Sequence, residues 1–507
     1  MKHRFAAAVT ALTLLTLPAG APLTAQAESF GALTYEVYTD HVEITGCDSA
    51  AISVTIPEEI DGLPVTGIGE GAFEGCKSLT SVTIPESVTG IGTWAFNRCE
   101  SLTSVTVPES VTSIGQSAFM GCKSLSTIVI PESVTSIGTD AFYDTAWYDS
   151  QPDGLIYAGR VAYEYKGTCT GEIVLRPDTA GIADECFNTQ GELSSVTIPE
   201  GVTSIGYGVF SGCTGLTSVT VPEGVTSIGK GAFKGCTSLS TIVIPESVTS
   251  IGTDAFSDTA WYDSQPDGLI YAGLVAYRYK GTCTGEIVLR PDTAGIADEC
   301  FRGQRELSSV TIPEGVTSIG YGVFSGCKGL TSVTIPESVT SIGNYAFGNT
   351  GLTAVVIPKS VTLIADEAFS YCKQLQTVTV LNPDCIINAN FQNSTFYYEL
   401  TPFLEEPGVS GHFDGTFYGN EGSSIHRYAR NNADRFISLE ALAAAKTGDL
   451  NADGTQTVLD AVILQKHLVR SAPLCPFQTP LADVNGDHTI NIIDLALLKR
   501  ALTQNHA

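Results

Sequence analysis

The sequence predicts a repeat solenoid of short strands with an irregular return path, followed by a small α-helical module. The motif Ile-Gly/Ala-x-x-Ala/Cys/Val-Phe recurs along most of the chain, mainly at steps of 23 residues. A fixed period in this range is typical of solenoids, whose coils bury their apolar side chains only by stacking on one another. The motif begins at Ile68, Ile91, Ile114, Ile137, Ile182, Ile205, Ile228, Ile251, Ile296, Ile319, Ile342 and Ile364.

One coil shows why the sequence favours this fold. In LTSVTIPESVTGIGTWAFNRC (79–99), the run LTSVTI alternates apolar and polar residues and is rich in β-branched side chains, as a strand requires. Pro85 ends the strand, because proline cannot donate a hydrogen bond to a neighbouring strand. Apolar positions on the return path, such as Val88 and Phe96, complete the core. A larger unit, 101–214, recurs almost unchanged at 215–328.

The N-terminal residues 1–27 indicate a signal peptide. A basic start, MKHR, precedes an apolar run and the sequence TAQA, which resembles a cleavage site ending at Ala27. We therefore expect a secreted, extracellular protein. No later stretch is long and apolar enough for an integral membrane segment. The net charge of -28 argues against nucleic acid and anionic membranes as partners, because both attract basic surfaces.

The cysteines occupy a recurring slot three residues after a phenylalanine. Seven of the fourteen cysteines stand there, and Thr145 and Thr350 fill the same slot in other coils. This pattern favours free, buried thiols over disulfides, although stacked coils would bring some cysteines within disulfide reach. The seven cysteines are Cys76, Cys99, Cys122, Cys213, Cys236, Cys327 and Cys372.

Two columns of polar residues run along the predicted coils. Ser and Thr alternate with the buried residues of each strand, as at Ser81 and Thr83, and a glutamate follows the proline of many coils, as at Glu86. We interpret both columns mainly as solvated positions. The alternatives are a broad surface for an extended ligand and a row of charges that recruits cations.

The residues do not favour an enzyme. No histidine occurs between Ile68 and Val380, which excludes a Ser-His-Asp or Cys-His site there. A pair of carboxylates needs no histidine, but it needs a cleft, and a uniform repeat offers rows instead. A polysaccharide-degrading enzyme (glycoside hydrolase) with an unrecognised site, and a purely structural spacer or adhesin, remain the alternatives.

The repeat IPxxVxxIGxxAFxxCxxL resembles the BspA-like leucine-rich repeats of bacterial surface proteins. The resemblance implies an N-terminal cap at 28–66, a solenoid at 67–380 and an irregular region with a C-terminal cap at 381–440. Two nearly identical inserts, 145–167 and 259–281, resemble one common in this family. Their aromatic residues either plug the core or stack on sugar rings; they are Trp147, Tyr148, Trp261 and Tyr262.

Two acidic loops near the C-terminus, GDLNADGTQTVLD and ADVNGDHTINIID, have the spacing of calcium-binding loops. Oxygen-bearing residues stand at alternating positions, and an aspartate closes each loop at position 12. Position 6 normally requires glycine for a sharp turn; Gly454 fits, whereas His488 must tolerate positive φ. The candidate ligands are Asp449, Asn451, Asp453, Thr455, Thr457 and Asp460 in the first loop, and Asp483, Asn485, Asp487, Thr489, Asn491 and Asp494 in the second.

An apolar stripe at helical spacing follows each loop, comprising Val458, Ala461, Leu464 and Leu468, then Ile492, Leu495, Leu498 and Leu502. Two calcium loops, each leading into a helix, resemble the type I dockerin of cellulosome-forming anaerobic bacteria. The resemblance covers 447–507, after a linker at 441–446. It implies two calcium ions, calcium-dependent folding and docking onto the cohesin module of a scaffold protein.

The resemblance also indicates which residues contact cohesin. They are the pairs at positions 10 and 11 of each loop and a pair in each following helix, namely Val458, Leu459, Gln465 and Lys466, then Ile492, Ile493, Lys499 and Arg500. The near-symmetry of the two halves permits two docking orientations. We therefore expect a non-catalytic protein that presents its solenoid as a protein- or cell-wall-binding surface, in the context of polysaccharide breakdown.

Overall fold

The computed structural model describes residues 28–388, 413, 415–432, 434–469, 474–475 and 477–504. The expected signal peptide lies outside these residues, as does most of the segment 389–414. The chain divides into two compact units, residues 1–168 with 178–186, and residues 169–177 with 187–507. Among the described residues, no helix has the length and apolar character needed to cross a membrane.

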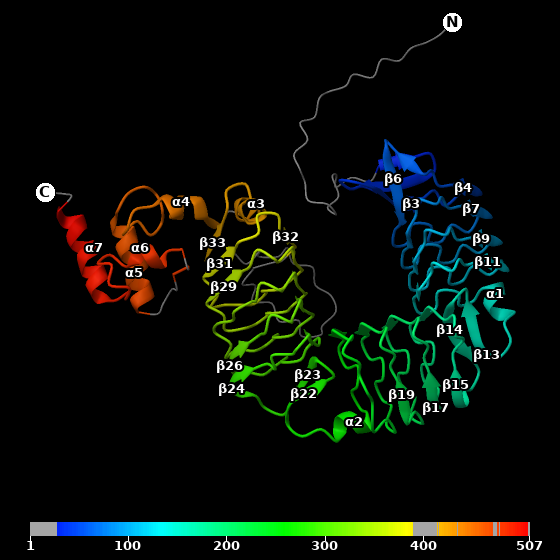
Figure 1. Cartoon of the computed structure of the whole chain (residues 1–507). Helices are drawn as coiled ribbons and strands as arrows, with labels where there is room; N and C mark the ends of the chain where they lie inside the picture. Colours follow the sequence, from blue (N-terminus) through cyan, green and yellow to red (C-terminus); the bar gives the residue numbers. More distant parts are fainter. Residues whose placement is uncertain are drawn as a thin grey trace, which may run out of the picture. The chain divides into compact units, whose positions relative to one another are not determined.

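The first unit begins with an antiparallel hairpin that covers the first coil. Strands β2 (Leu33–Val37) and β3 (Val42–Cys47) pair antiparallel, and β3 then pairs in parallel with β6 (Leu63–Ile68). From β6 on, the coils add one short parallel strand each (Figure 1). The sheet is β1 (Glu28–Phe30), β2, β3, β6, β8 (Gly90–Ile91), β10 (Ser113–Ile114) and β12 (Ser136–Ile137), and β5 (Glu59–Ile60) pairs with β6.

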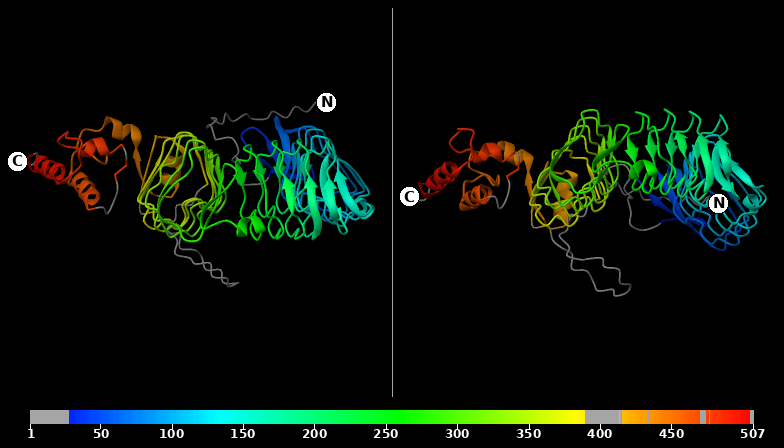
Figure 2. Two further views of the ribbon diagram at one scale, coloured as in Figure 1. Left: turned by 60° about the horizontal axis from the view of Figure 1, so that its bottom comes forward. Right: turned by 90° about the horizontal axis from the view of Figure 1, so that it is seen from below.

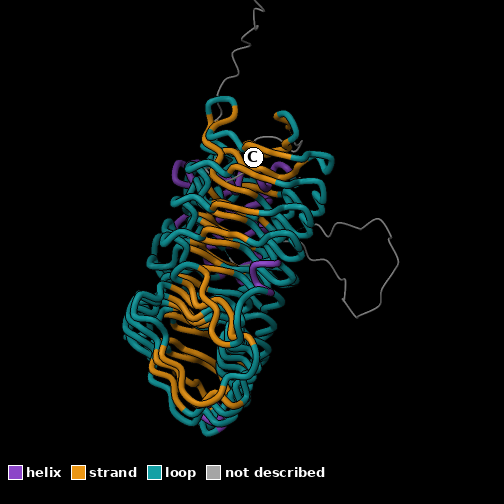
Figure 3. The backbone as a smooth tube through the Cα atoms, turned by 90° about the vertical axis from the view of Figure 1, so that its right-hand side faces the viewer, coloured by secondary structure: helices purple, strands orange, loops and turns teal. Residues whose placement is uncertain are grey.

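A second sheet of this unit carries the predicted strand of each coil. Its strands are β4 (Ser53–Thr55), β7 (Ser81–Thr83), β9 (Ser104–Thr106) and β11 (Thr127–Val129). Identical residues face one another, so that Ser53 pairs with Ser81 and Ser81 with Ser104. Stacked strands joined by loops are visible along the solenoid in Figure 3. The repeat therefore folds into a solenoid, as the sequence predicts.

Rows of phenylalanine rings run through the cores. In the first unit Phe73, Phe96, Phe119 and Phe142 stack with centroids 4.7, 5.1 and 5.7 Å apart. The second unit holds two such rows, formed by Phe187, Phe210, Phe233 and Phe256, and by Phe301, Phe324, Phe347 and Phe369. Each ring is at most 1% exposed, so every coil depends on its neighbours for its core.

The cysteine thiols join successive coils. All fourteen cysteines are free, as the repeated slot predicts. The Cys99 thiol donates to the Phe73 carbonyl at 3.1 Å, and the Cys122 thiol donates to Phe96 at the same distance. Cys213 makes the equivalent bond to Phe187, and burial raises the pKa of its thiol to about 12. Each of these carbonyls also accepts a backbone N–H bond from its own turn, so the protonated thiol is a second donor that comes from the next coil.

Each insert closes one row of rings. In the first insert, α1 (Ala146–Asp149) brings Trp147 edge-on to Phe142, with centroids 5.1 Å apart. The Phe142 N–H donates to the hydroxyl of Tyr163, which lies on β14 (Val161–Lys166). The second insert repeats this arrangement around Phe256. The insert elements are α1, β13 (Gly154–Ala158) and β14, with β16 (Gly181–Ile182), then α2 (Ala260–Asp263), β22 (Gly268–Ala272), β23 (Val275–Lys280) and β25 (Gly295–Ile296).

The second unit contains the remaining coils, in five further short sheets. One is β15 (Thr170–Val174), β17 (Glu192–Thr197) and β19 (Ser218–Thr220); another is β18 (Ser204–Ile205), β20 (Ser227–Ile228) and β21 (Ser250–Ile251). A third is β24 (Thr284–Val288) with β26 (Glu306–Thr311). A fourth is β27 (Ser318–Ile319), β28 (Ser341–Ile342), β30 (Leu363–Ile364) and β32 (Ile386–Ile387).

The fifth sheet extends the solenoid beyond residue 380. It runs β29 (Ala354–Ile357), β31 (Thr377–Val380), β33 (Thr416–Gly419) and β34 (Arg435–Ser438), all in parallel. Helix α3 (Ser424–Asn431) connects its last two strands. Helix α4 (Leu439–Ala444) follows, with Leu442 buried, so the first four residues of the expected linker are helical and pack as part of the cap.

The C-terminal region from residue 447 on has its own small core. Its helices are α5 (Val458–Leu468), α6 (Thr479–Ala482) and α7 (Ile492–Gln504). The core consists of Leu450, Ala461, Leu464, Ala482, Leu495, Leu498 and Leu502. Val458 and Ile492, which the sequence places on the apolar stripes, are instead 69% and 68% exposed. Each is the first residue of its helix, and among the described residues no other element covers that turn.

Candidate calcium sites and docking faces

The first acidic loop wraps around its own carboxylates. Asp449 accepts hydrogen bonds from the backbone N–H groups of Asp453 and Gly454 at 3.2 and 3.0 Å. Asp453 in turn accepts from the N–H and the hydroxyl of Thr455. The Asn451 amide donates to Asp453 at 2.8 Å. Positions 1, 3, 5 and 7 of the loop are therefore held close together by short-range bonds.

Asp460 closes the first loop and starts the helix after it. One of its carboxylate oxygens accepts from the N–H groups of Leu450 and Asn451. The other accepts from the N–H and the hydroxyl of Thr457. Thr457 is the N-cap of α5 and forms a capping box with Asp460. The closing aspartate thus ties both ends of the loop to the first turn of the helix.

The second loop repeats this arrangement 34 residues later. Asp483 accepts from the N–H groups of Gly486, Asp487 and His488. Asp494 accepts from Val484 and Asn485 through one oxygen, and from Asn491 through the other. The side chains at positions 3 and 5 are again joined, and Asp487 also accepts from the N–H of Thr489. The structure thus brings the predicted residues of each loop together.

The sixth residue of each loop has positive φ. Gly454 has φ of 88° and His488 has φ of 63°. The His488 ring lies 3.8 Å from Asp483 and is 97% exposed. A side chain in this conformation is strained, whereas glycine is not. The second loop therefore adopts the same turn as the first, at a conformational cost that the first avoids.

The two loops are electrostatically suited to a cation. Asp449, Asp460 and Asp494 are 2%, 0% and 0% exposed. Burial raises the pKa of Asp449, and the neighbouring negative charges of Asp460 and Asp453 raise it further. Bonds from Thr455 and Asn451 lower the pKa of Asp453. Buried carboxylates that repel one another would be stabilised by a divalent cation.

The carboxylates of the loops do not yet converge on one point. Among the described residues, no group of three or more His, Cys, Asp or Glu side chains is placed to hold a metal, because the aspartates of each loop point their oxygens at backbone N–H groups. The oxygen donors nevertheless fit calcium in kind and in order. A carboxylate has about four lone-pair sites, so these aspartates would ligate calcium while they keep the N–H bonds that shape the loop.

Two exposed apolar pairs flank the loops. Val458 and Leu459 begin α5 and are 69% and 55% exposed, and Ile492 and Ile493 begin α7 and are 68% and 54% exposed. The basic pair Lys499 and Arg500 is also exposed on α7. Large apolar side chains paired on a surface mark interaction sites. The apolar pairs expected to contact cohesin are therefore exposed to solvent on both helices.

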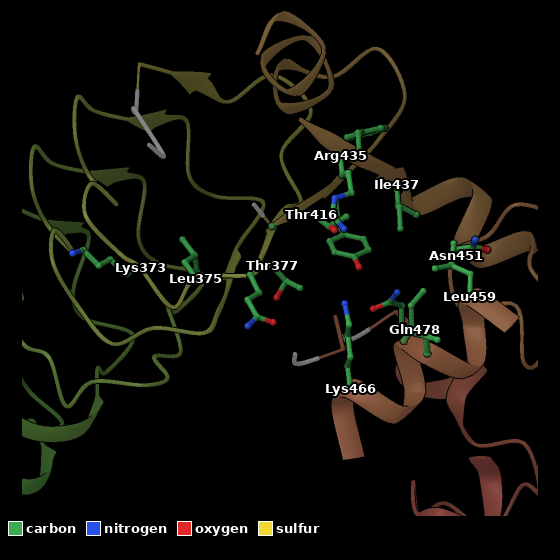
Figure 4. Close-up of a pocket in the computed structure, with 16 residues that line it drawn as sticks. Lys373, Leu375, Thr377, Thr416, Arg435, Ile437, Asn451, Leu459, Lys466 and Gln478 are labelled. Atoms are coloured by element: carbon green, nitrogen blue, oxygen red, sulfur yellow. The ribbon is translucent and has the colours of Figure 1, made fainter. Parts of the chain in front are cut away.

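A recess of about 640 Å³ lies between the last coils of the solenoid and α5 (Figure 4). The sequence did not predict it, because its walls come from segments with no shared period. On the dockerin side it is lined by Asn451, Leu459, Val462, Ile463, Lys466 and Gln478. The opposite wall includes Lys373, Thr377, Thr416 and Arg435.

The polar columns of the solenoid face solvent. Ser81 and Thr83 are exposed, and so is Glu86 at the turn after them. The Ser53 and Ser81 hydroxyls are 2.9 Å apart, so neighbouring coils are linked by hydrogen bonds along this surface. In the inserts, Trp147 packs partly buried against the core and Tyr148 is 8% exposed. Both of these aromatic residues of the first insert therefore pack against the core.

The comparisons with known proteins agree with these observations. The family model of the BspA type leucine rich repeat region matches residues 47–150, 161–264 and 292–401, which together exceed half the chain. The chain therefore belongs to the BspA-type leucine-rich repeat family. The type I dockerin domain matches residues 447–503. Both predicted resemblances are confirmed, and neither matched family is an enzyme family.

Solved structures of bacterial leucine-rich repeat proteins are similar to the chain. One from Bacteroides ovatus is 24% identical and covers 81% of this chain and 99% of its own, with a TM-score of 0.28. A leucine rich cell surface protein from Faecalibacterium prausnitzii is 23% identical, over 72% and 94%, with a TM-score of 0.28. The T. pallidum leucine rich repeat protein is 32% identical, over 41% and 88%, with a TM-score of 0.26. No curated protein matches the chain.

Proposed function

We propose that this chain is a secreted, non-catalytic repeat protein that docks onto a scaffold cohesin through its calcium-dependent dockerin. The observation that carries the proposal is the pairing of each acidic loop with an exposed apolar pair on the helix it begins. Asp460 binds the backbone of its loop and caps α5. Calcium binding there would therefore order the first turn of α5.

The second loop supports the same role. Asp494 holds its loop to the start of α7, where Ile492 and Ile493 are exposed. We infer two calcium ions, one in each loop. The partner would offer an apolar patch near negative charge, because the second pair is accompanied by Lys499 and Arg500.

The solenoid is the cargo in this proposal. Its Ser/Thr surface and its row of glutamates are accessible, and the insert aromatics support the coils. We propose that it presents a protein- or cell-wall-binding surface to the scaffold assembly, in the context of polysaccharide breakdown. Cell-wall polysaccharide incubated with the purified protein should release no reducing sugar.

Calorimetric titration tests the docking role directly. Residues 28–507 would be titrated against a panel of type I cohesin modules, first with calcium and then with a chelator. The proposal predicts tight binding that disappears when calcium is removed. Binding that persists in the chelator, or no binding to any cohesin while calcium still binds, would contradict it.

A further inference from the structure

The dockerin packs against the C-terminal cap through a buried apolar cluster. Tyr418 on β33 and Leu439 and Leu442 on α4 form it together with Cys475 and Leu481 of the dockerin. All five are at most 8% exposed. The pKa of Tyr418 is raised, mainly because the side chain is buried. A hydrogen bond with Gln478 offsets part of this rise. The contact therefore combines apolar packing with a polar bond between the two parts.

Gln478 connects this cluster to the first calcium loop. It is 1% exposed, and its amide donates to the Leu450 carbonyl at 2.6 Å. Its amide oxygen accepts from the N–H of Cys475 at 3.0 Å. Both bonds lie within the dockerin and hold its first loop against Cys475 of the cluster, because breaking either one leaves a buried polar group unpaired.

One face of α5 consequently points at the solenoid. Leu459, Val462, Ile463 and Lys466 have the spacing of one helical face, and all four line the recess. Two of them, Leu459 and Lys466, belong to the first group of residues expected to contact cohesin. Across the recess stand Lys373, Thr416 and Arg435 of the solenoid (Figure 4).

The equivalent face of α7 has no such obstruction. It carries Ile493 and Arg500, which correspond to Leu459 and Lys466, and no α7 residue is among the described residues that line the recess. In Figures 1 and 2, α7 lies on the side of α5 away from strands β31 and β33 of the same unit. The two halves of the dockerin are similar in sequence but differ in their access to a large partner.

The size of the recess decides what can use it. About 640 Å³ is the volume of a site for a small molecule. A stable interface between folded proteins covers about 800 Å² on each partner. To cover Leu459 and Lys466 with an interface of that size, a folded module would have to enter the space between α5 and the last coils, which the α7 face does not require.

We propose that this chain docks in a single orientation, through the α7 face formed by Ile492, Ile493, Lys499 and Arg500, because the solenoid blocks the α5 face. This inference rests on the proposed function, since the occupant is a cohesin module. It replaces the two orientations that the sequence symmetry permits. The cap thus determines which of two similar faces meets the scaffold.

Two matched variants of residues 28–507 test the orientation. Ile492→Asp with Ile493→Asp should weaken binding to an immobilised type I cohesin by at least about 100-fold, because both are central apolar contacts. Val458→Asp with Leu459→Asp should change it by less than about threefold, as expected outside an interface. Calorimetry and circular dichroism must show that both variants still bind calcium and keep their helices.

The outcomes separate the inference from the proposed function. If the parent chain binds no cohesin, both the cohesin docking and the single orientation are refuted. If it binds and each variant alone retains binding, both faces are usable and the single orientation is refuted, while cohesin docking stands. Loss of binding only in the Val458/Leu459 variant would also overturn the inference.

A third chain tests whether the solenoid is the cause. About fifteen Gly and Ser residues inserted after Ala445 give a flexible connection, and Leu442→Asp breaks the apolar cluster. In this background the Ile492/Ile493 variant should regain binding to within about tenfold of the parent, because the α5 face becomes accessible. If this variant does not regain binding, the side chains of the α7 face, and not obstruction by the solenoid, determine the preferred orientation. That result would overturn the proposal.

Discussion

Arg278 Nη1 lies 2.7 Å from Asp254 Oδ1, so an ion pair joins the second insert to the coil before it. The first insert has the equivalent aspartate, Asp140, but carries Glu164 where the second has Arg278. Burial raises the pKa of Glu164, and the negative charge of Asp140 adds to this effect. The two nearly identical inserts thus differ in one pair of charged residues, and comparing them shows what that pair contributes to stability.

Glu164→Arg should stabilise the first insert. The change replaces two like charges with the ion pair that the second insert already contains, at the cost of the bond from the Tyr148 hydroxyl to Glu164. We expect a gain of about 1 kcal/mol in the unfolding free energy, measured by urea denaturation. Glu164→Gln, which removes the charge alone, is the control, and an Arg variant less stable than the Gln variant would refute the expectation.

Stability at the first insert should depend on pH. A carboxyl group whose folded pKa lies above its ordinary value, here 4.5, stabilises the fold while it is protonated. That contribution is fully present below the unfolded pKa and is lost as pH rises through the folded pKa. The wild type should therefore lose stability relative to Glu164→Gln as the pH rises from 4.5 through the raised pKa of Glu164. Parallel melting curves for the two proteins across this range would contradict the prediction.

Asp460→Asn should abolish calcium binding at the first loop. The carboxylate is fully buried, so the substitution removes a negative charge from the candidate site with little change in shape. We expect a loss of at least about 100-fold in affinity at that loop, because ligand charge sets affinity over several orders of magnitude. Calorimetry should show one ion in place of two. Thr455→Val is the matched control, since position 7 contributes its backbone carbonyl; it should retain both ions.

His488→Gly should tighten the second loop. Histidine pays a conformational cost of about 1 kcal/mol at positive φ, and glycine does not. Calcium affinity at this loop should therefore rise about fivefold, whereas the reciprocal change Gly454→His should weaken the first loop by a similar factor. Calorimetric titration of both variants measures this. An unchanged affinity in His488→Gly would show that the bound loop relieves the strain in another way.

Removing calcium should unfold the dockerin and leave the solenoid intact. Metal binding supplies folding energy to the small helical region, whereas the coils are held by their own core. All three tryptophans lie in the solenoid, at positions 94, 147 and 261. A chelator should therefore reduce the helical signal in circular dichroism without shifting tryptophan emission. A simultaneous change in both signals would mean that the two parts unfold together.

The repeats were the most predictable part of the structure. Phe96 and Cys99 stand in slots that recur in most coils, and a recurring apolar slot in a solenoid has to face the shared core. The role of Trp147 was less certain, because a loop aromatic more often packs on the core but can also bind a ligand. Its edge-on contact with Phe142 favours packing and could be known only from the fold.

Sequence reasoning was weakest where the period ends. Strands β33 and β34 continue the sheet, but the segment before them departs from the repeat and gives no register. Val458 was placed on an apolar stripe by spacing alone, whereas exposure depends on what covers the first turn of a helix. Tyr418 and Leu481 belong to one apolar cluster although they come from two non-repeating segments. Local sequence patterns do not predict packing between such segments.

The rows of stacked phenylalanines have a consequence for how such a protein changes length. Within the part of the chain that the structure describes, each row holds four rings, and the inserts close the rows that end at Phe142 and Phe256 with the same tryptophan and tyrosine contacts. The unit 101–214 and its copy at 215–328 therefore begin and end on matching surfaces. Duplication of this unit in the gene can add a set of coils without any new contact surface having to evolve. The solenoid can therefore lengthen by one whole unit at a time.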